Sequence, residues 1–446
     1  MNHLRRIREF VLQFAVVIIF VGCGGKSQTA ATILITNLPA YGTTGNLAGI
    51  VLGADPAACR VAVFVDVPPY GWYSKPTCAQ ALTVIQPDGS WSADITTGGM
   101  DTNATRIAAL LVSTNYNQPC VLGELFLPTN VFAEAIASAV VTREYPGVRW
   151  IGFSGYDWWV KASSGTNQRG PGPNFFSDST NNVWTDAQGW LHLRITNRSN
   201  QWQCAEIVSA RTFGHGSYRF ELGSRVDDLD TNIVLGMFTW SDDPAYAYRE
   251  MDVECSRGFA ADTNNAQFTV QPYYLSGHYS RYQVPTGLAD STHLFTWQSN
   301  SVTFQSQRSS YLPNPDPTNL IGAWTFANAS AVPQTGDENV RINLWLLFGH
   351  PPSDGQEVEL VIKSFQFVPP GSPRPALLTD LNAAPIGSVE FTIRGEPDRR
   401  YQVQTSTNLL DWQHLTAILA TRNLVPFKDD SQIGAAQRFY RAVTLP

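Results

Sequence analysis

The chain has 446 residues, of which 15% are charged and 12% are aromatic, and it contains 34 Gly and 28 Pro. A chain of this length is expected to hold roughly two to four domains. Its composition is typical of exported β-proteins with many turns, and it excludes a disordered chain or a long helical assembly. The formal charge of −7 and the lack of a basic patch with interleaved aromatic residues argue against nucleic acid as a partner.

The N-terminal segment 1–23 has the pattern of an export signal. Three arginines precede an apolar run at 10–22, which is too short for an ordinary membrane-spanning helix. The run ends in Phe20-Val21-Gly22-Cys23, which resembles a bacterial lipoprotein signal whose Cys23 becomes the lipidated first residue. We therefore expect a lipoprotein of the bacterial cell envelope, in the periplasm or at the cell surface, held to envelope lipid through Cys23. The alternative is a plain secretory signal and a secreted protein.

Residues 30–130 are predicted to form an N-terminal β-module, because strand-like stretches alternate there with Gly, Pro and Asn turns. These stretches are residues 60–67, 89–95 and 106–112. Since the cysteines and the seven scattered histidines show no zinc-ligand spacing, no catalytic metal is expected.

An aromatic loop and two cysteines stand out in this module. An exported chain permits disulfides, and Cys78 and Cys120 could form one here. Tyr70, Trp72 and Tyr73 cluster shortly before Cys78 and could present a carbohydrate-binding platform. Packing beneath the disulfide is the favoured alternative for these rings.

Residues 140–368 are predicted to form the central domain, and its most informative stretch is Glu250-Met251-Asp252-Val253-Glu254. Side chains alternate between the two faces of a β-strand, so the three carboxyls share one face and the apolar residues share the other. Such acids suit the hydrolysis of a glycosidic bond, which needs one carboxyl as the acid and a second as the nucleophile. The alternative is a surface strand with solvated carboxylates, which the apolar face and the adjoining aromatic strand disfavour.

The spacing of these acids also constrains the shape of the strand. Retaining glycosidases hold their two key carboxyls about 5–5.5 Å apart, whereas four residues along a flat strand span about 13 Å between α-carbons. The two distances agree only if the strand bends and its side chains lean together on the concave face of a curved sheet. Three clustered carboxyls do not all ionise readily, so one proton is expected to remain near neutral pH, as an acid catalyst requires.

Several strings in this domain resemble glycoside hydrolase family 16, the lichenases and laminarinases. They are Cys204-Ala205-Glu206-Ile207, Gly214-His215-Gly216-Ser217-Tyr218, Gly236-Met237-Phe238-Thr239-Trp240, Glu250-Met251-Asp252-Val253-Glu254, Gln267-Phe268, His293-Leu294-Phe295-Thr296-Trp297 and Asn343-Leu344-Trp345. The resemblance implies a concanavalin A-like jelly-roll sandwich. It also implies an endo-acting retaining glycosidase that requires no cofactor, with a structural calcium ion on the outer sheet.

The resemblance also implies catalytic roles. Glu250 would be the nucleophile, and Glu254 would protonate the leaving oxygen and then activate water. Asp252 would hydrogen-bond the nucleophile and tune the shared proton. The chain departs from the family at Val208, where lichenases commonly carry a sugar-binding Arg, and at Thr269, where they often carry Asn. The expected substrate is β-1,3 or mixed-linkage β-1,3/1,4-glucan. Agarose-like galactans, a catalytically silent glycan-binding protein and a transglycosylase are the alternatives.

Substrate-binding residues are expected among the aromatic side chains of the concave face, because sugars stack their apolar faces on aromatic rings. Trp240 precedes the catalytic strand and is the best candidate, with core packing as its alternative. Trp158 is a second candidate, although only one of Trp158 and Trp159 can face the cleft if their segment is a strand. Tyr273 could line the rim of the cleft. His293 could reach the cleft, whereas a buried core histidine is the commoner outcome.

A Pro-rich linker is predicted at 369–376, since proline cannot join a β-ladder. Residues 377–446 then resemble a C-terminal β-sandwich found on secreted proteins of environmental bacteria, through Tyr401-Gln402-Val403-Gln404-Thr405-Ser406-Thr407-Asn408-Leu409 and Arg438-Phe439-Tyr440-Arg441. This resemblance implies a spacer or attachment role. We therefore expect an all-β monomer with a central jelly-roll sandwich, flanked by two smaller β-sandwich modules, whose partner is a polysaccharide.

Overall fold

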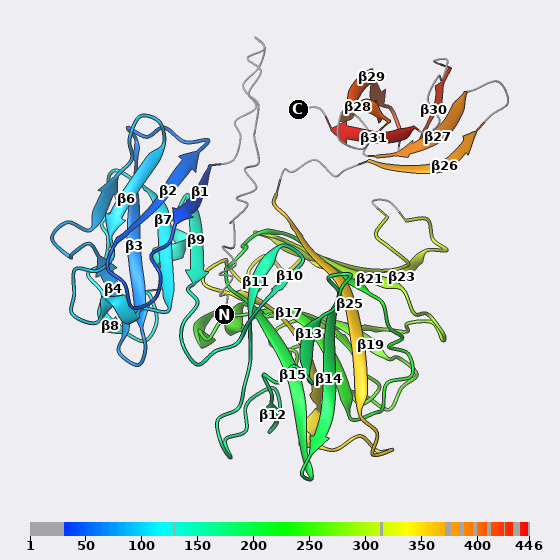
Figure 1. Ribbon diagram of the computed structural model, residues 1–446, viewed down its shortest axis with the longest axis horizontal. Helices are drawn as coiled ribbons and strands as arrows, with labels where there is room; N and C mark the ends of the chain where they lie inside the picture. Colours follow the sequence, from blue (N-terminus) through cyan, green and yellow to red (C-terminus); the bar gives the residue numbers. More distant parts are fainter. Residues whose placement is uncertain are drawn as a thin grey trace, which may run out of the picture.

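The computed structural model describes residues 31–128, 130–312, 315–370, 376–383, 388–395, 399–407, 412–422, 424–430 and 438–444 (Figure 1). The signal segment with Cys23 and residues 371–375 of the linker lie outside the described residues. Strands dominate this part of the chain, which confirms the all-β prediction. The helical segments are short, namely α1 (Asn130–Ala133), η1 (Asp101–Asn103), η2 (Pro244–Arg249) and η3 (Leu347–Gly349). No helix in the described ranges is long and apolar enough to cross a membrane.

The N-terminal module consists of two sheets. One has the order β1-β2-β6, with β1 (Thr32–Asn37), β2 (Asn46–Leu52) and β6 (Ser90–Asp94). The other has the order β8-β4-β3-β7-β9 with β5 paired to β3; its strands are β3 (Cys59–Val67), β4 (Gly71–Lys75), β5 (Leu82–Val84), β7 (Arg106–Ser113), β8 (Leu122–Glu124) and β9 (Ala137–Thr142). Strand β9 lies beyond the expected end of this module at residue 130, and its pairing with β7 extends the sheet.

Apolar side chains of both sheets, including Leu47, Val63 and Trp91, form the core of this module. Cys78 and Cys120 form a disulfide, and Trp72 is buried while Tyr70 is exposed. The aromatic loop therefore contributes its tryptophan to the interior, in agreement with the packing interpretation.

The central domain is a sandwich of two curved layers that share one continuous path of strands, β20-β19-β18-β17-β24-β15-β14-β25-β16-β21-β22-β23. Strands β10, β11, β12 and β13 join the same sheet off this path. The bounds are β10 (Trp150–Phe153), β11 (Tyr156–Val160), β12 (Phe175–Phe176), β13 (Val183–Thr185), β14 (Leu191–Arg198), β15 (Gln201–Ser209), β16 (Gly216–Leu222), β17 (Ile233–Trp240), β18 (Met251–Cys255), β19 (Ala266–Val270), β20 (Tyr279–Tyr282), β21 (Ser291–Gln298), β22 (Ser301–Arg308), β23 (Leu320–Phe326), β24 (Asn339–Leu346) and β25 (Val358–Val368). This arrangement is the predicted jelly-roll.

The layers meet because each strand places alternate apolar side chains in one shared core. Met251 and Val253 of β18, Ile342 of β24, and Phe220 and Phe295 of the opposite layer are all buried in it. Burying such large side chains stabilises each by roughly 1.5–3 kcal/mol relative to exposure. The other face of β20-β19-β18-β17-β24-β15 is left for polar side chains, and the candidate site lies there.

The C-terminal module has two sheets of three strands, β26-β27-β30 and β29-β28-β31. The bounds are β26 (Leu377–Ala383), β27 (Val389–Arg394), β28 (Arg399–Ser406), β29 (Gln413–Ala420), β30 (Leu424–Asp429) and β31 (Phe439–Thr444). Phe391, Ile393, Tyr401 and Val403 are buried in its core.

Candidate active site

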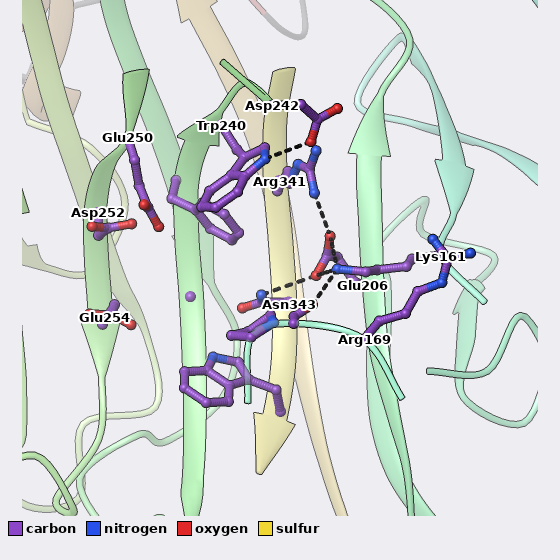
Figure 2. Close-up of a pocket in the computed structure, with 15 residues that line it drawn as sticks. Lys161, Arg169, Glu206, Trp240, Asp242, Glu250, Asp252, Glu254, Arg341 and Asn343 are labelled. Carbon is purple, nitrogen blue, oxygen red and sulfur yellow. Dashed lines mark hydrogen bonds and ion pairs between the residues drawn. The ribbon is translucent and has the colours of Figure 1, made fainter. Parts of the chain in front are cut away.

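Strand β18 lies between β17 and β19 in the layer whose polar face is open. Met251, Val253 and Cys255 point into the core and are fully buried. Glu250, immediately before the strand, and Asp252 and Glu254 on it line the opposite face (Figure 2). The predicted alternation of the acid strand is therefore present in the structure.

These carboxyls stand between two adjoining cavities, and both cavities are lined by Glu250 and Glu254. The first, here named the β24 basin, has a volume of about 390 Å³ and contains Lys161, Glu206, Trp240, Arg341, Asn343 and Trp345 in its wall. The second, here named the β20 basin, has a volume of about 590 Å³ and is lined by Phe259, Gln267, Gln271, Tyr273, Tyr279 and Phe348. A chain-like ligand could thus extend on both sides of the acids.

Burial controls the protonation of the three acids. Burial first, and then the neighbouring charge of Glu254, raise the pKa of Glu250 to about 8. Burial raises the pKa of Glu254 to about 7. The pKa of Asp252, which is only 3% exposed, lies well above its ordinary value because of burial and the charges of both glutamates. The trio therefore retains protons at neutral pH, and it shares them, so the order of the values does not assign a role to each residue.

Hydrogen bonds favour the charged form of each glutamate. Asp252 bonds the carboxyl of Glu250, which lowers the pKa of Glu250. Gln267 Nε2 donates to Glu254 Oε2 over 2.9 Å and lowers the pKa of that carboxyl. Gln271 Nε2 donates to Asp252 Oδ2 over 3.2 Å. Each acid is thus oriented by a different partner. Asp252 of β18 orients Glu250, whereas Gln267 of β19 and Gln271, just after β19, orient Glu254 and Asp252.

The opposite wall of the β24 basin is a cluster of charged and amide groups centred on Glu206 of β15 (Figure 2). Lys161 Nζ lies 2.9 Å from Glu206 Oε2 and 3.0 Å from Oε1, and Arg341 Nη1 lies 3.3 Å from Oε1. Asn343 Nδ2 donates to Glu206 Oε2 over 3.2 Å. Because Glu206 is fully buried, the two cations compensate a charge that would otherwise be costly to bury.

One acceptor in this cluster is still available. Asn343 is buried, and its Oδ1 has no hydrogen-bond partner among the residues that the structure describes. Buried polar atoms without a partner are uncommon in folded proteins. An incoming hydroxyl group could satisfy this oxygen.

Trp240 contributes an aromatic ring to the wall of the β24 basin, and Tyr248 stacks on that ring. Trp240 and Tyr248 lie with ring centroids 4.6 Å apart and an angle of 8° between their planes. Trp240 Nε1 donates to Asp242 Oδ1 over 3.1 Å, which orients the indole ring. Trp240 therefore lies in the wall of the β24 basin, and its role in substrate binding stays a prediction.

The other predicted substrate-binding residues lie in different places. Tyr273 is 61% exposed and lines the rim of the β20 basin. The prediction for Trp158 is wrong, because its ring points between the layers, packs edge-on against Phe365 and is fully buried. The prediction for His293 is also wrong. This histidine lies on β21 of the opposite layer, is bonded to Ser306 Oγ over 2.7 Å, and burial lowers its pKa to about 4.

Several cleft residues were not predicted, and Lys161, Arg341 and Phe348 are among them. Arg341 pairs across the strands with Val208, the position at which the family pattern has an Arg, so the guanidinium comes from the adjacent strand. The alternation of polar and apolar residues in β24 could have identified Arg341. No sequence signal that we recognise distinguishes Lys161 or Phe348.

The described part of the chain contains no group of three or more His, Cys, Asp or Glu side chains that could hold a metal ion. The calcium ion implied by the family resemblance stays a prediction.

No protein-family model matches the chain, and neither does any curated protein. Solved structures are similar to about half of it. A family 16 hydrolase of the Bacteroides ovatus mixed-linkage glucan PUL, in complex with a G4G4G3G product, is 13% identical over 47% of this chain and 94% of that one, with a TM-score of 0.34.

Two mycobacterial structures give similar values. A β-1,3-glucanase from Mycobacterium marinum is 17% identical over 47% of this chain and 90% of that one, with a TM-score of 0.37. The immunostimulatory antigen and pseudo β-1,3-glucanase of Mycobacterium tuberculosis is 16% identical over 46% and 88%, with a TM-score of 0.35. The chain is thus similar to family 16 glucanases and to a pseudo-glucanase, at low identity and over about half of its length.

Proposed function

We propose that this protein is an exported, retaining endo-β-glycosidase that hydrolyses β-1,3 or mixed-linkage β-1,3/1,4-glucan by double displacement. The observation that carries the proposal is the row of Glu250, Asp252 and Glu254 between two cavities that both glutamates line. Because a cavity lies on each side of the acids, a polysaccharide could cross them with sugars bound on both sides. Such a cleft suits cleavage within a chain.

In the first step, a carboxylate oxygen of Glu250 attacks the anomeric carbon while the bond from that carbon to the leaving oxygen breaks. Glu254 transfers its proton to the leaving oxygen, so the shortened chain departs as an alcohol. In the second step, Glu254 takes a proton from water, and the water oxygen displaces Glu250 from the anomeric carbon. Each step therefore leaves the two glutamates in the protonation state that the next step requires.

Asp252 supports this cycle without contacting the bond that breaks. Burial and the charges of both glutamates raise the pKa of Asp252 well above its ordinary value, which favours the protonated form that can donate a hydrogen bond to Glu250. This bond stabilises the negative charge that returns to Glu250 when the covalent intermediate is hydrolysed.

The walls of the cleft suit neutral sugar rings. Trp240 lines the β24 basin beside the acids, and the face of its ring that Tyr248 does not cover provides a stacking surface. Aromatic rings bind the apolar faces of sugars in this way. Asn343 Oδ1 would accept one sugar hydroxyl. Tyr273 would provide a further surface at the rim of the β20 basin.

The proposal is tested by measuring the reducing ends released by the mature protein from lichenan, laminarin, agarose, carrageenan and xyloglucan. The Glu250→Gln variant is the matched control, since it replaces one carboxyl oxygen by an amide nitrogen at nearly constant volume. Release from lichenan or laminarin by the parent, and its loss in the variant, would support the proposal. Release from agarose alone would move the substrate to galactans.

Two outcomes would contradict hydrolysis. Binding of a polymer by both proteins without release would indicate a glycan-binding protein. Products longer than the added oligosaccharides would indicate a transglycosylase, because that reaction passes the same covalent intermediate to a sugar instead of water.

A further inference from the structure

An ion-pair network joins the N-terminal module to the central domain. Arg106 of β7 lies with its Nε 3.1 Å from Asp66 Oδ2 in its own module. Its Nη1 lies 3.1 Å from Asp337 Oδ2, in the loop before β24 of the central domain. These side chains are largely buried. Removing one partner therefore destabilises the protein more than removing one partner of an exposed ion pair does.

The network continues from Asp337 toward the acids. Asp337 Oδ1 lies 3.5 Å from Arg249 Nη1, and Arg249 directly precedes Glu250 in the chain. The side chain of Arg249 is only 3% exposed. It also donates to Ser241 Oγ over 3.0 Å and to the Gln334 carbonyl over 3.0 Å. Arg106, Asp337 and Arg249 thus form a continuous path from the N-terminal module to the residue next to the proposed nucleophile.

Gly336 shows how closely this path is packed. A β-carbon at Gly336 would come within 2.3 Å of Arg249 Nε. The loop before β24 can therefore approach the guanidinium only because residue 336 has no side chain.

Arg249 ends a turn whose backbone is strained. Ala247, Tyr248 and Arg249 have φ values of +49°, +58° and +50°, a left-handed conformation that residues with a β-carbon rarely adopt in succession. Such a conformation persists only where surrounding contacts hold it. The Arg249 side chain supplies several of these contacts, including a cation–π contact at 4.1 Å with the ring of Tyr246.

This turn determines two features of the cleft. It places Tyr248 against Trp240, and it leads into Glu250, whose amide donates to the Ala247 carbonyl over 3.3 Å. A shift of the turn would therefore move both the stacking surface and the carboxyl of Glu250.

We propose that Arg106 of the N-terminal module is a positioning residue for the 247–249 turn, so that the N-terminal module is a working part of the active site. Arg106 neutralises Asp337 from one side and thereby holds its carboxyl where Arg249 can bind it. Without Arg106, Asp66 and Asp337 would both lose their shared cation, and Asp337 would move relative to Arg249 or draw water into the interface. The consequence for catalysis rests on the proposed glycosidase function, whereas the consequence for the turn does not.

The test compares Arg106→Gln and Arg106→Lys with Arg60→Gln, a control on β3 of the same module, where Arg60 Nη1 donates to the Cys59 carbonyl. Hydrogen exchange of a peptide covering 241–250 reports on the turn in the full-length protein. We expect faster exchange there in Arg106→Gln, unchanged exchange over β24, and partial recovery in Arg106→Lys. The Arg60 control should match the parent protein.

The kinetic readout uses whichever polymer the parent protein cleaves. Arg106→Gln is expected to lower kcat about tenfold, as a small displacement of a reacting group does, with a smaller change in KM. Folded Arg106→Gln protein with parental exchange at 241–250 and parental kcat would overturn the inference.

Two further arms keep the outcome decisive. If Arg106→Gln does not fold, Asp337→Asn interrupts the same path from the central domain and should give the same exchange pattern; parental exchange in it would overturn the inference. If the parent protein cleaves no polymer, the proposed function fails while hydrogen exchange still decides whether Arg106 holds the turn.

Discussion

Gly236 of β17 lies directly opposite Glu254 of β18 in the paired strands. A β-carbon at Gly236 would come within 2.5 Å of Asn343 Oδ1, the acceptor without a partner in the described part of the chain. Because residue 236 has no side chain, the space above β17 beside Glu254 stays open, and Gly236 forms the floor of the cleft there. A sugar ring can approach the acid at this point.

We expect Gly236→Ala to lower kcat/KM at least about tenfold, because the added methyl group displaces Asn343 and raises the cleft floor. Overpacking should also lower the free energy of unfolding by about 1–3 kcal/mol. Gly152→Ala on β10 is the control, since nothing lies within 4 Å of a β-carbon there. Steady-state kinetics and thermal unfolding of both variants provide the measurement. Parental activity in Gly236→Ala would contradict the assigned floor of the cleft.

Glu254→Ala should lose at least about hundredfold in activity on polymer, the usual contribution of a general acid. Azide should restore turnover of a substrate with an activated leaving group, because it needs no base to attack the anomeric carbon of the Glu250 intermediate. Asp252→Asn is the comparison variant, and azide should not accelerate it. A folded Glu254→Ala protein that azide does not rescue would exclude Glu254 as the acid and base.

The pH dependence of kcat/KM should be a narrow bell with its maximum between about 7 and 8, because one glutamate must be ionised and the other protonated. Burial raises the pKa of both Glu250 and Glu254. Both sides of the bell therefore lie at higher pH than they would for exposed carboxyls. Initial rates measured at low substrate concentration from about pH 4 to about pH 10 give this profile of kcat/KM. A maximum near pH 4–5, roughly the ordinary range of carboxyl pKa values, would show that the acids are not shielded from water.

The same raised pKa values predict how stability changes with pH. Between the ordinary pKa of glutamate and the raised values, the folded state binds more protons than the unfolded state, so the free energy of unfolding falls as pH rises. Glu254→Gln removes one such group, since its pKa in the folded protein is about 7. The variant should therefore gain stability relative to the parent as pH rises through this window, by an amount of the order of 1–3 kcal/mol. Urea unfolding at several pH values measures the difference. A constant difference between the two proteins would contradict the raised pKa.

Phe348 is 69% exposed, has a φ of +54° and lines the β20 basin. An exposed aromatic ring on a left-handed residue indicates a binding role, because folding gains little from it. Phe348→Ala should raise KM for polymer about threefold to tenfold without lowering thermal stability. Leu122→Ala, at an equally exposed apolar residue of the N-terminal module, is the control. An unchanged KM in Phe348→Ala would remove this residue from the substrate path.

The acid strand could be predicted because its signal is local. Alternation with a period of two assigns Glu250, Asp252 and Glu254 to one face of β18 whatever the neighbouring strands are. The same alternation is present in β24, where Asn339, Arg341, Asn343 and Trp345 alternate with apolar residues. The alternation in β24 could therefore also have predicted which of its side chains face the cleft.

The two incorrect substrate-binding predictions have a common cause. The presence of an aromatic residue in a strand does not reveal whether its ring faces the core or the cleft. Trp158 is turned to the interior by packing against Phe365 of the opposite layer, and His293 belongs to that layer altogether. The positions of both side chains depend on which strands pair and which layers pack together, and a single sequence does not specify this.

The sequence by itself determined the all-β class and the face of β18 that carries the acids, because strand propensity, turns and alternation act over a few neighbouring residues. Only the tertiary structure decided that Glu206, Arg341 and Lys161 meet across the cleft from Glu254, and that Arg106 reaches Asp337. These contacts join positions 45 to 231 residues apart in the chain. Their free energy depends on strand order and on burial of charge, and neither is encoded in the residues next to them.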